Sequence, residues 1–234
     1  MNTDLLDYTK TNDARVLQSK TFARIAKLYD LPNKRVLDIG SGVGSYMQRF
    51  GPNSVGVTTR QDEVALGKSI SRDIRFANAE TLKEKLSPDE KFDVIWCNNI
   101  FEHLLSPHSF LVKLKEFSTP DTLIILGTPI VPVLPNLMNI RKFSGALAGA
   151  HVNFFTYDTY KLTAQYAGWE VQDMSAHYFD SAILNSITAR FTPHLYLVAK
   201  NNIDYRYDEK KVHEWKDDSY YDEMITIMNK VDQK

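Results

Sequence analysis

The chain has 234 residues, enough for one large α/β domain around a single core. Its 28 basic and 29 acidic residues leave a formal net charge of −1, which gives no long-range field to attract a polyanion, so we expect no nucleic-acid partner. The only cysteine, Cys97, cannot form an intramolecular disulfide and lies in an apolar run. A buried packing role and a reducing, cytoplasmic location are therefore expected.

Neither a targeting segment nor a membrane span is expected. The amino terminus carries acidic residues where a secretory signal would carry basic ones. The longest apolar tract, LIILGTPIVPVLP at 123–135, contains three prolines and is shorter than the roughly twenty residues of a membrane helix.

The first half of the chain alternates helical and strand patterns. Apolar residues at helical spacing predict a helix over 12–29, which ends before the LPNK sequence at 31–34. Apolar or β-branched runs then predict strands at 35–40, 54–59, 92–98 and 122–128. Strands that are apolar throughout and separated by helices are typical of a parallel sheet covered on both faces.

The second half continues this alternation after one long interruption. Ser106-Pro107 begins one predicted helix, and Thr156 caps another that Gly168 closes. Further strands are predicted at 169–174 and 194–200. Residues 130–150 form a long connection with proline and glycine, and connections of this length are often functional, so a lid over a site is expected there.

From Asn201 onward the composition becomes charged and aromatic. A predicted helix in this extension, 201–234, carries one apolar stripe at Met224, Ile227, Met228 and Val231. We expect the stripe to dock on its own domain or on a second subunit.

The segment VLDIGSGVG at 36–44 combines a buried strand with three alternating glycines. Gly40, Gly42 and Gly44 permit a sharp turn and close approach to a ligand, and a following helix is expected to present free N–H groups there. Ser45 occupies the third glycine position of the dinucleotide fingerprint, which argues against a pyrophosphate ligand such as NAD.

Five segments in order resemble the class I S-adenosylmethionine-dependent methyltransferases, in their small-molecule branch. They are VLDIGSGVGSY, IRFANAETL, FDVIWCNNIFEHLLSP, TLIILGTP and HVNFFTYDTYKLTAQYAGWEV. Enzymes of ubiquinone and menaquinone biosynthesis and bacterial natural-product or sugar methyltransferases are similar. The resemblance covers about residues 14–200. It implies a Rossmann-like open sheet of seven mostly parallel strands, with helices on both faces and the last strand antiparallel. S-adenosylmethionine is the implied cofactor, with S-adenosylhomocysteine as product, bound by a domain over 1–200.

The resemblance also implies cofactor-binding residues. The methionine part of the cofactor is expected to bind to Asp38 and to the loop that includes Gly40, Ser41, Gly42 and Gly44. At the end of the second strand, Thr58 and Thr59 stand where the family has an acid for the ribose hydroxyls; either a threonine takes this role, or Asp62 or Glu63 reaches back. The adenine loop is Asn78, Ala79 and Glu80, while Asn98 and Asn99 should face the cofactor or the substrate.

His103 is the predicted general base, because imidazole titrates near neutral pH. Glu102 could orient it, and His151 is a second candidate; for each histidine a purely structural role is the alternative. No metal is expected, since the fourth and fifth predicted strands end in asparagines and in Gly127-Thr128-Pro129 rather than carboxylates, although Glu102 and His103 leave a metal open.

The acceptor is the least determined feature. In or just after the lid, Arg141 could hold an anionic group, and Phe143 and Phe154 could line an apolar wall. We expect methyl transfer to a small molecule, with O-methylation preferred and N-methylation next, and a homodimer formed through the lid or the extension. The alternatives are a methyltransferase-fold binding or assembly protein without turnover, and an NAD-dependent oxidoreductase.

Overall fold

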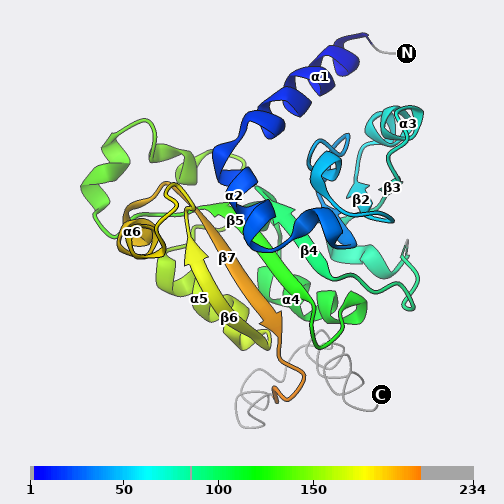
Figure 1. Cartoon of the computed structure of the whole chain (residues 1–234). Helices are drawn as coiled ribbons and strands as arrows, with labels where there is room; N and C mark the ends of the chain where they lie inside the picture. Colours follow the sequence, from blue (N-terminus) through cyan, green and yellow to red (C-terminus); the bar gives the residue numbers. More distant parts are fainter. Residues whose placement is uncertain (1–2, 85, 207–234) are drawn as a thin grey trace.

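The computed structural model describes residues 3–84 and 86–206. Seven strands form one sheet, in the order β3-β2-β1-β4-β5-β7-β6 (Figure 1). The strands are β1 Val36–Ile39, β2 Val55–Thr58, β3 Ile74–Phe76, β4 Val94–Asn98, β5 Leu123–Pro129, β6 Trp169–Ser175 and β7 His194–Asn201. The α-helices are α1 Thr3–Gln18, α2 Lys20–Leu28, α3 Gln61–Ser69, α4 Pro107–Leu114, α5 Tyr157–Tyr166 and α6 Ala182–Thr188.

Strand direction follows the expected Rossmann-like pattern. The pairs among β3, β2, β1, β4 and β5 are parallel, whereas β7 runs antiparallel to both β5 and β6. Strand β1 lies inside the sheet between β2 and β4, because the chain leaves it first toward β2 and later returns to its other side as β4. In open α/β sheets ligands bind at the carboxyl ends of strands at such a switch point, here the ends of β1 and β4.

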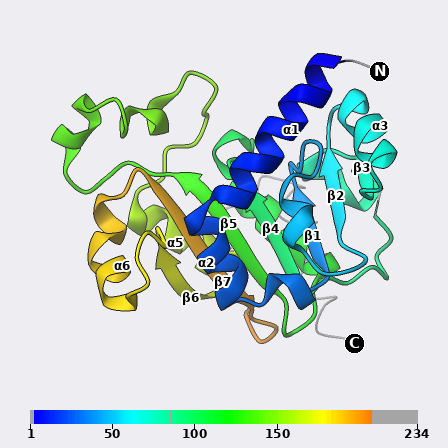
Figure 2. The ribbon, with the colours of Figure 1, turned by 45° about the horizontal axis from the view of Figure 1, so that its top comes forward.

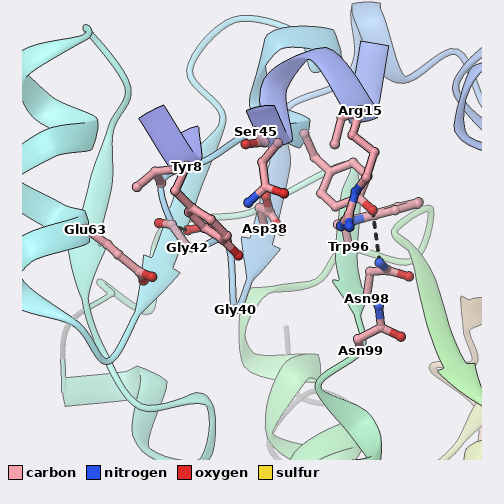
Figure 3. Close-up of a pocket in the computed structure, with 15 residues that line it drawn as sticks. Tyr8, Arg15, Asp38, Gly40, Gly42, Ser45, Glu63, Trp96, Asn98 and Asn99 are labelled. Carbon is pink, nitrogen blue, oxygen red and sulfur yellow. Dashed lines mark hydrogen bonds between the residues drawn. The ribbon is translucent and has the colours of Figure 1, made fainter. Parts of the chain in front are cut away.

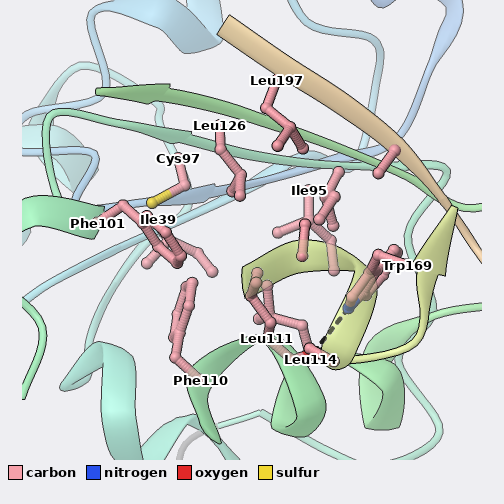
Figure 4. Close-up of a cluster of buried hydrophobic side chains, with 14 of the residues drawn as sticks. Ile39, Ile95, Cys97, Phe101, Phe110, Leu111, Leu114, Leu126, Trp169 and Leu197 are labelled. Carbon is pink, nitrogen blue, oxygen red and sulfur yellow. Dashed lines mark hydrogen bonds between the residues drawn. The ribbon is translucent and has the colours of Figure 1, made fainter. Parts of the chain in front are cut away.

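The two faces of the sheet bury alternate residues of each strand. Leu37, Ile39 and Ile95 belong to the larger core, together with the inner sides of α4 and α5 (Figure 4). Val94 and Trp96 belong to a second core that α2 covers. Cys97 is buried in the first core, as expected. Burial on both faces explains why these strands read as continuous apolar runs rather than as an alternating pattern.

The predicted helix over 12–29 is wrong in its extent, since two helices occupy this region. Helix α1 ends at Gln18, and Ser19 caps α2 by accepting a hydrogen bond on Oγ from the Phe22 N–H at 3.2 Å. A serine side chain that satisfies a free N–H favours a new helix start at this position. Helix α1 extends away from the sheet in both ribbon views (Figure 2).

Two further features differ from the pattern in the sequence. Strand β3 has only three residues, too few for a periodic signal, and no separate strand was predicted there. The connection after β5 contains 3₁₀ turns at Pro135–Asn139 and Ser144–Leu147 and projects on the side of α6 (Figure 2). The predicted helix with Met224 and Val231 lies outside the described residues. Within the described ranges, no helix combines the length and apolarity needed to cross a bilayer.

Candidate active site

A cavity of about 230 Å³ lies at the carboxyl ends of β1 and β4, beneath α1 (Figure 3). Six of the predicted cofactor residues line it: Asp38, Gly40, Ser41, Gly42, Asn98 and Asn99. Glu63, one of the two alternatives for the acid after β2, lines it as well. The other lining residues all come from outside the predicted set: Tyr8, Asn12, Arg15, Val16, Val43, Ser45, Tyr46 and Trp96.

The glycine loop turns back over the end of β2. The Gly40 and Ser41 N–H groups donate to the Val57 carbonyl at 3.0 and 2.9 Å. Gly40 has a φ of +72°, and a Cβ there would overlap the Ile100 side chain, so only glycine fits.

The helix predicted after this loop is wrong. Tyr46–Arg49 forms a four-residue 3₁₀ turn, because only a few residues separate Gly44 from Gly51-Pro52, which ends helical structure. The loop therefore lacks an α-helix N-terminus for a phosphate.

Asp38 is the most perturbed acid at the cavity. Asp38 is 2% exposed, and its Oδ2 has no hydrogen-bond partner among the residues that the structure describes. Burial raises the pKa of the carboxyl group to about 8. A cationic group placed in the cavity would favour the ionised carboxylate, because an opposite charge offsets the cost of desolvation.

Asn98 and Asn99 are both held in place by side-chain hydrogen bonds. Asn98 Nδ2 donates to Tyr46 Oη at 3.0 Å, and burial raises the pKa of Tyr46 to about 12, so its hydroxyl stays protonated (Figure 3). Asn99 has a φ of +56° and its Oδ1 accepts from His194 Nε2 at 2.9 Å. Burial lowers the pKa of His194 to about 4, so this imidazole is neutral.

The structure separates the two candidate acids that follow β2. The Glu63 side chain is 12% exposed, and its carboxylate accepts a hydrogen bond from Thr58 Oγ1 at 2.6 Å. Asp62 pairs with exposed Arg60 at 2.6 Å and does not line the cavity, while the same Arg60 lies 3.6 Å from Glu63 Oε1. The Thr58 hydroxyl is therefore used in a hydrogen bond to Glu63, and neither Thr58 nor the exposed Thr59 lines the cavity.

Helix α1 adds a polar face that the sequence interpretation missed. Tyr8, Asn12 and Arg15 recur at spacings of four and three, which places them on one side of a helix, and all three line the cavity. Asp13 fastens this helix to the glycine loop: its carboxylate accepts from Ser45 Oγ at 2.7 Å and pairs with Arg72 at 2.7 Å. The spacing of these polar residues at i, i+4 and i+7 is the pattern in the sequence from which this cavity-lining face could have been predicted.

The predicted adenine loop has local hydrogen bonds of its own. Asn78 Oδ1 accepts from the Glu80 N–H at 2.9 Å, which is an Asx turn. Glu80 Oε1 accepts from the Leu105 and Ser106 N–H groups at 2.9 and 3.1 Å. Asn78, Ala79, Glu80 and Gly44 do not line the cavity.

The three predicted catalytic residues come together. Glu102 and His103 lie on the 3₁₀ turn Phe101–His103 after β4, and His151 returns from the long connection. Glu102 Oε1 lies 3.9 Å from His103 Nε2 and 4.0 Å from His151 Nε2.

The predicted substrate residues lie on the long connection, away from the cavity lining. Arg141 is exposed, Phe143 is half-buried and Phe154 is 52% exposed. The neighbouring Phe155 belongs instead to the core, where it stacks on Phe101.

Comparison with known proteins agrees with this geometry. Residues 11–173, more than half of the chain, match the family described as "Methyltransferase domain". Tocopherol O-methyltransferase, chloroplastic, of Arabidopsis thaliana is 28% identical over 105 residues, which cover 41% of this chain and 30% of that protein. Ubiquinone biosynthesis O-methyltransferase of Bradyrhizobium diazoefficiens is 28% identical over 135 residues, 54% of this chain and 49% of that protein.

The chain thus spans 30% and 49% of the length of these two relatives. A crystal structure of an S-adenosylmethionine-dependent methyltransferase from Archaeoglobus fulgidus superposes with a TM-score of 0.56 at 21% identity, covering 82% of this chain and 94% of that one, and so shares the fold. The chain belongs to the methyltransferase domain family, and it shares the fold of class I S-adenosylmethionine-dependent methyltransferases.

Proposed function

We propose that the protein transfers the methyl group of S-adenosylmethionine to an oxygen atom of a small-molecule acceptor. The observation that carries this proposal is the cavity at the switch point, which buried Asp38 lines with its Oδ2 lacking a hydrogen-bond partner in residues 3–84 and 86–206. S-adenosylmethionine supplies an electrophilic methyl group on a sulfonium and carries an α-ammonium. The α-ammonium favours the ionised form of Asp38, which accepts its hydrogen bonds, and the glycine loop lets the backbone approach the ligand.

The residues present fit the rest of the cofactor as well. Glu63 takes the place of the acid expected at the end of β2, since its carboxylate faces Gly42 and lines the cavity. An acceptor-only carboxylate suits the two ribose hydroxyls. Because Asn78 Oδ1 is engaged in its own turn, we assign Asn78 to the loop structure and leave the adenine contact to the Ala79 backbone.

The catalytic contribution of the protein is mainly positional. In-line placement of the acceptor oxygen against the methyl carbon supplies most of the rate gain, and Asn98 and Asn99 are rigid enough to serve this purpose. A hydroxyl acceptor must also lose its proton. We assign this proton removal to the cluster of Glu102 and His103, on the turn that follows β4, with His151 from the long connection.

O-methylation is favoured over N-methylation because the two relatives described above are named as O-methyltransferases. A fold-retaining binding protein is the second candidate, since the acid expected after β2 is displaced to Glu63. An NAD-dependent oxidoreductase is disfavoured by the absence of an α-helix directly after the glycine loop.

Thermal-shift measurements on the full chain test cofactor choice. S-adenosylmethionine and S-adenosylhomocysteine should raise the melting temperature while NAD should not, because only ligands of the native state stabilise it. Stabilisation by NAD alone would overturn the proposal.

Formation of S-adenosylhomocysteine with a panel of phenols, aliphatic alcohols and amines then tests turnover. Product with hydroxyl acceptors supports O-methylation, and product with amines alone supports N-methylation. Cofactor binding without product from any acceptor class would favour the binding-protein alternative.

A further inference from the structure

Two segments distant in the chain bring one carboxylate and two imidazoles to a single point. Glu102, His103 and His151 each present a ligand atom, and these atoms all lie within 4.8 Å of one another. The two imidazole rings meet edge to face, with centroids 4.8 Å apart. We call these three residues the Glu-His-His cluster.

Glu102 is an unusual acid in this cluster. It is 1% exposed, and Oε2 accepts a hydrogen bond from Thr128 Oγ1 at 2.8 Å. Its other oxygen, Oε1, has no hydrogen-bond partner within residues 3–84 and 86–206, although it faces both histidines. A buried carboxylate oxygen without a donor is costly unless a cation or proton comes to it.

Hydrogen bonds to backbone carbonyls orient both imidazoles. His103 Nδ1 lies 2.9 Å from the Ala150 carbonyl, and His151 Nδ1 lies 3.1 Å from the Ala146 carbonyl. A carbonyl only accepts, so each Nδ1 carries a proton, and Nε2 is the ring nitrogen that faces Glu102 Oε1 and can bind a metal. This pairing of an Nδ1–H with a carbonyl is the usual support of a metal-bound histidine.

We propose that the Glu-His-His cluster binds one divalent transition-metal cation through Glu102 Oε1, His103 Nε2 and His151 Nε2. Two imidazole ligands favour zinc over magnesium or calcium, which prefer oxygen ligands; manganese, which also takes oxygen ligands, is the weaker-binding probe. Tetrahedral zinc with bonds of about 2.0–2.1 Å holds its ligand atoms about 3.4 Å apart. The two Glu–His distances of 3.9 and 4.0 Å exceed this by about half an ångström and the third pair lies within 4.8 Å, so the side chains must rotate inward to bind one ion.

Three protein ligands leave coordination positions open, as in catalytic rather than structural zinc sites. The His103 side chain is 39% exposed, so the metal is reachable from solvent. The use of an open position rests on the proposed function: there the acceptor hydroxyl binds, loses its proton to solvent, and its oxygen forms the C–O bond as the S–C bond of the cofactor breaks. His103 cannot be general base at the same time, because its Nε2 lone pair is on the metal.

The test is metal binding by untagged full-length protein stripped with a chelator. Isothermal titration with Zn²⁺ and Mn²⁺, with metal content measured by mass spectrometry, should give one ion per chain, and Mg²⁺ should not compete. His103→Asn, Glu102→Gln and His151→Ala should each weaken binding by more than about 100-fold, above the loss typical of a supporting residue. His108→Gln, at a histidine outside the cluster, should leave binding unchanged.

Co²⁺ gives a second readout that does not depend on turnover. Its visible absorption bands should appear with the parent chain and disappear in His103→Asn, the variant at the most exposed of the three positions. Circular dichroism and S-adenosylhomocysteine binding verify that each variant is folded. Binding of no metal, or equal binding by parent and His103→Asn, overturns the inference.

The outcome is separable from that of the proposed function. If the protein binds S-adenosylhomocysteine but binds no metal, the cluster is refuted as a metal site and the proposed methyl transfer still stands. If the protein binds metal but S-adenosylmethionine does not raise its melting temperature, the metal site stands and the proposed function is refuted. Turnover that the chelator abolishes and Zn²⁺ or Mn²⁺ restores links the two, whereas turnover insensitive to the chelator refutes the metal's role in acceptor binding.

Discussion

Replacing Asp38 with asparagine should reverse the pH dependence of cofactor binding. Burial holds the pKa of Asp38 at about 8 in the unliganded protein, so near pH 6.5 the carboxyl group is almost wholly protonated. Pairing with the α-ammonium of S-adenosylhomocysteine requires the carboxylate, and binding at this pH must expel that proton. Asparagine keeps the shape of the side chain and has no proton to lose.

The expected size follows from the two titrations. Between pH 6.5 and 8.0 the ionised fraction of Asp38 rises from about 3% to about 50%, a gain of about sixteenfold. An α-amino group with a pKa of about 7.7–8.0 loses about half of its ammonium form over the same interval. The affinity of the parent chain should therefore tighten about eightfold, while that of Asp38→Asn should weaken about twofold.

Isothermal titration with S-adenosylhomocysteine, in two buffers of different ionisation enthalpy, measures both the affinity and the protons exchanged. At pH 6.5 the parent chain should release about one proton per ligand bound, and Asp38→Asn close to none. Asp62→Asn is the matched control and should keep the parent profile. If parent and Asp38→Asn showed the same pH dependence, the reasoning about Asp38 would be refuted.

The same shift affects stability without ligand. The folded-state pKa of about 8 lies above the unfolded value of about 3.9, so between these values the folded state holds a proton that the unfolded state has lost. The free energy of unfolding should fall as pH rises through this window, by up to about 1.4 kcal/mol per pH unit. Urea denaturation should show this slope in the parent chain and its loss in Asp38→Asn.

Three further predictions follow from single contacts. Glu63→Gln should raise the Kd of S-adenosylmethionine about tenfold or more by titration calorimetry, because a charged acceptor of hydrogen bonds is lost. Gly127→Ala should lower the free energy of unfolding by about 1–3 kcal/mol in urea, since its Cβ would overlap Asn98 Oδ1. Lys115→Met should lower it by more than about 3 kcal/mol in the same assay, because the buried ammonium donates to three carbonyl oxygens at 2.9–3.0 Å.

Each of these has its own contrary outcome. Asp62→Gln removes a neighbouring acid that does not line the cavity, so an effect equal to that of Glu63→Gln would count against a specific role for Glu63. A parent-like unfolding midpoint in Gly127→Ala would mean that the Asn98 side chain moves freely. A parent-like midpoint in Lys115→Met would show that the three carbonyls find other donors.

Local patterns in the sequence were enough for the frame of the site. Apolar runs bounded by turn residues predicted six of the seven strands, because burial on both faces of a parallel sheet requires such runs. Gly40 and Asp38 were predicted at the end of the first strand, and both line the cavity. The resemblance of five ordered segments to methyltransferases implied the seven-stranded, mostly parallel sheet with its antiparallel last strand, and the cofactor.

What the sequence by itself determined is therefore the sheet, the glycine loop and the kind of ligand, since these depend on residues close together in the chain. Only the tertiary structure chose Glu63 over Asp62, because the choice depends on which side chain points back toward Gly42. It alone placed α1 over the cavity and brought His151 to Glu102, since both depend on packing between distant segments. Spacing along a chain fixes which face a residue shares with its neighbours, whereas contacts across the fold decide what that face meets.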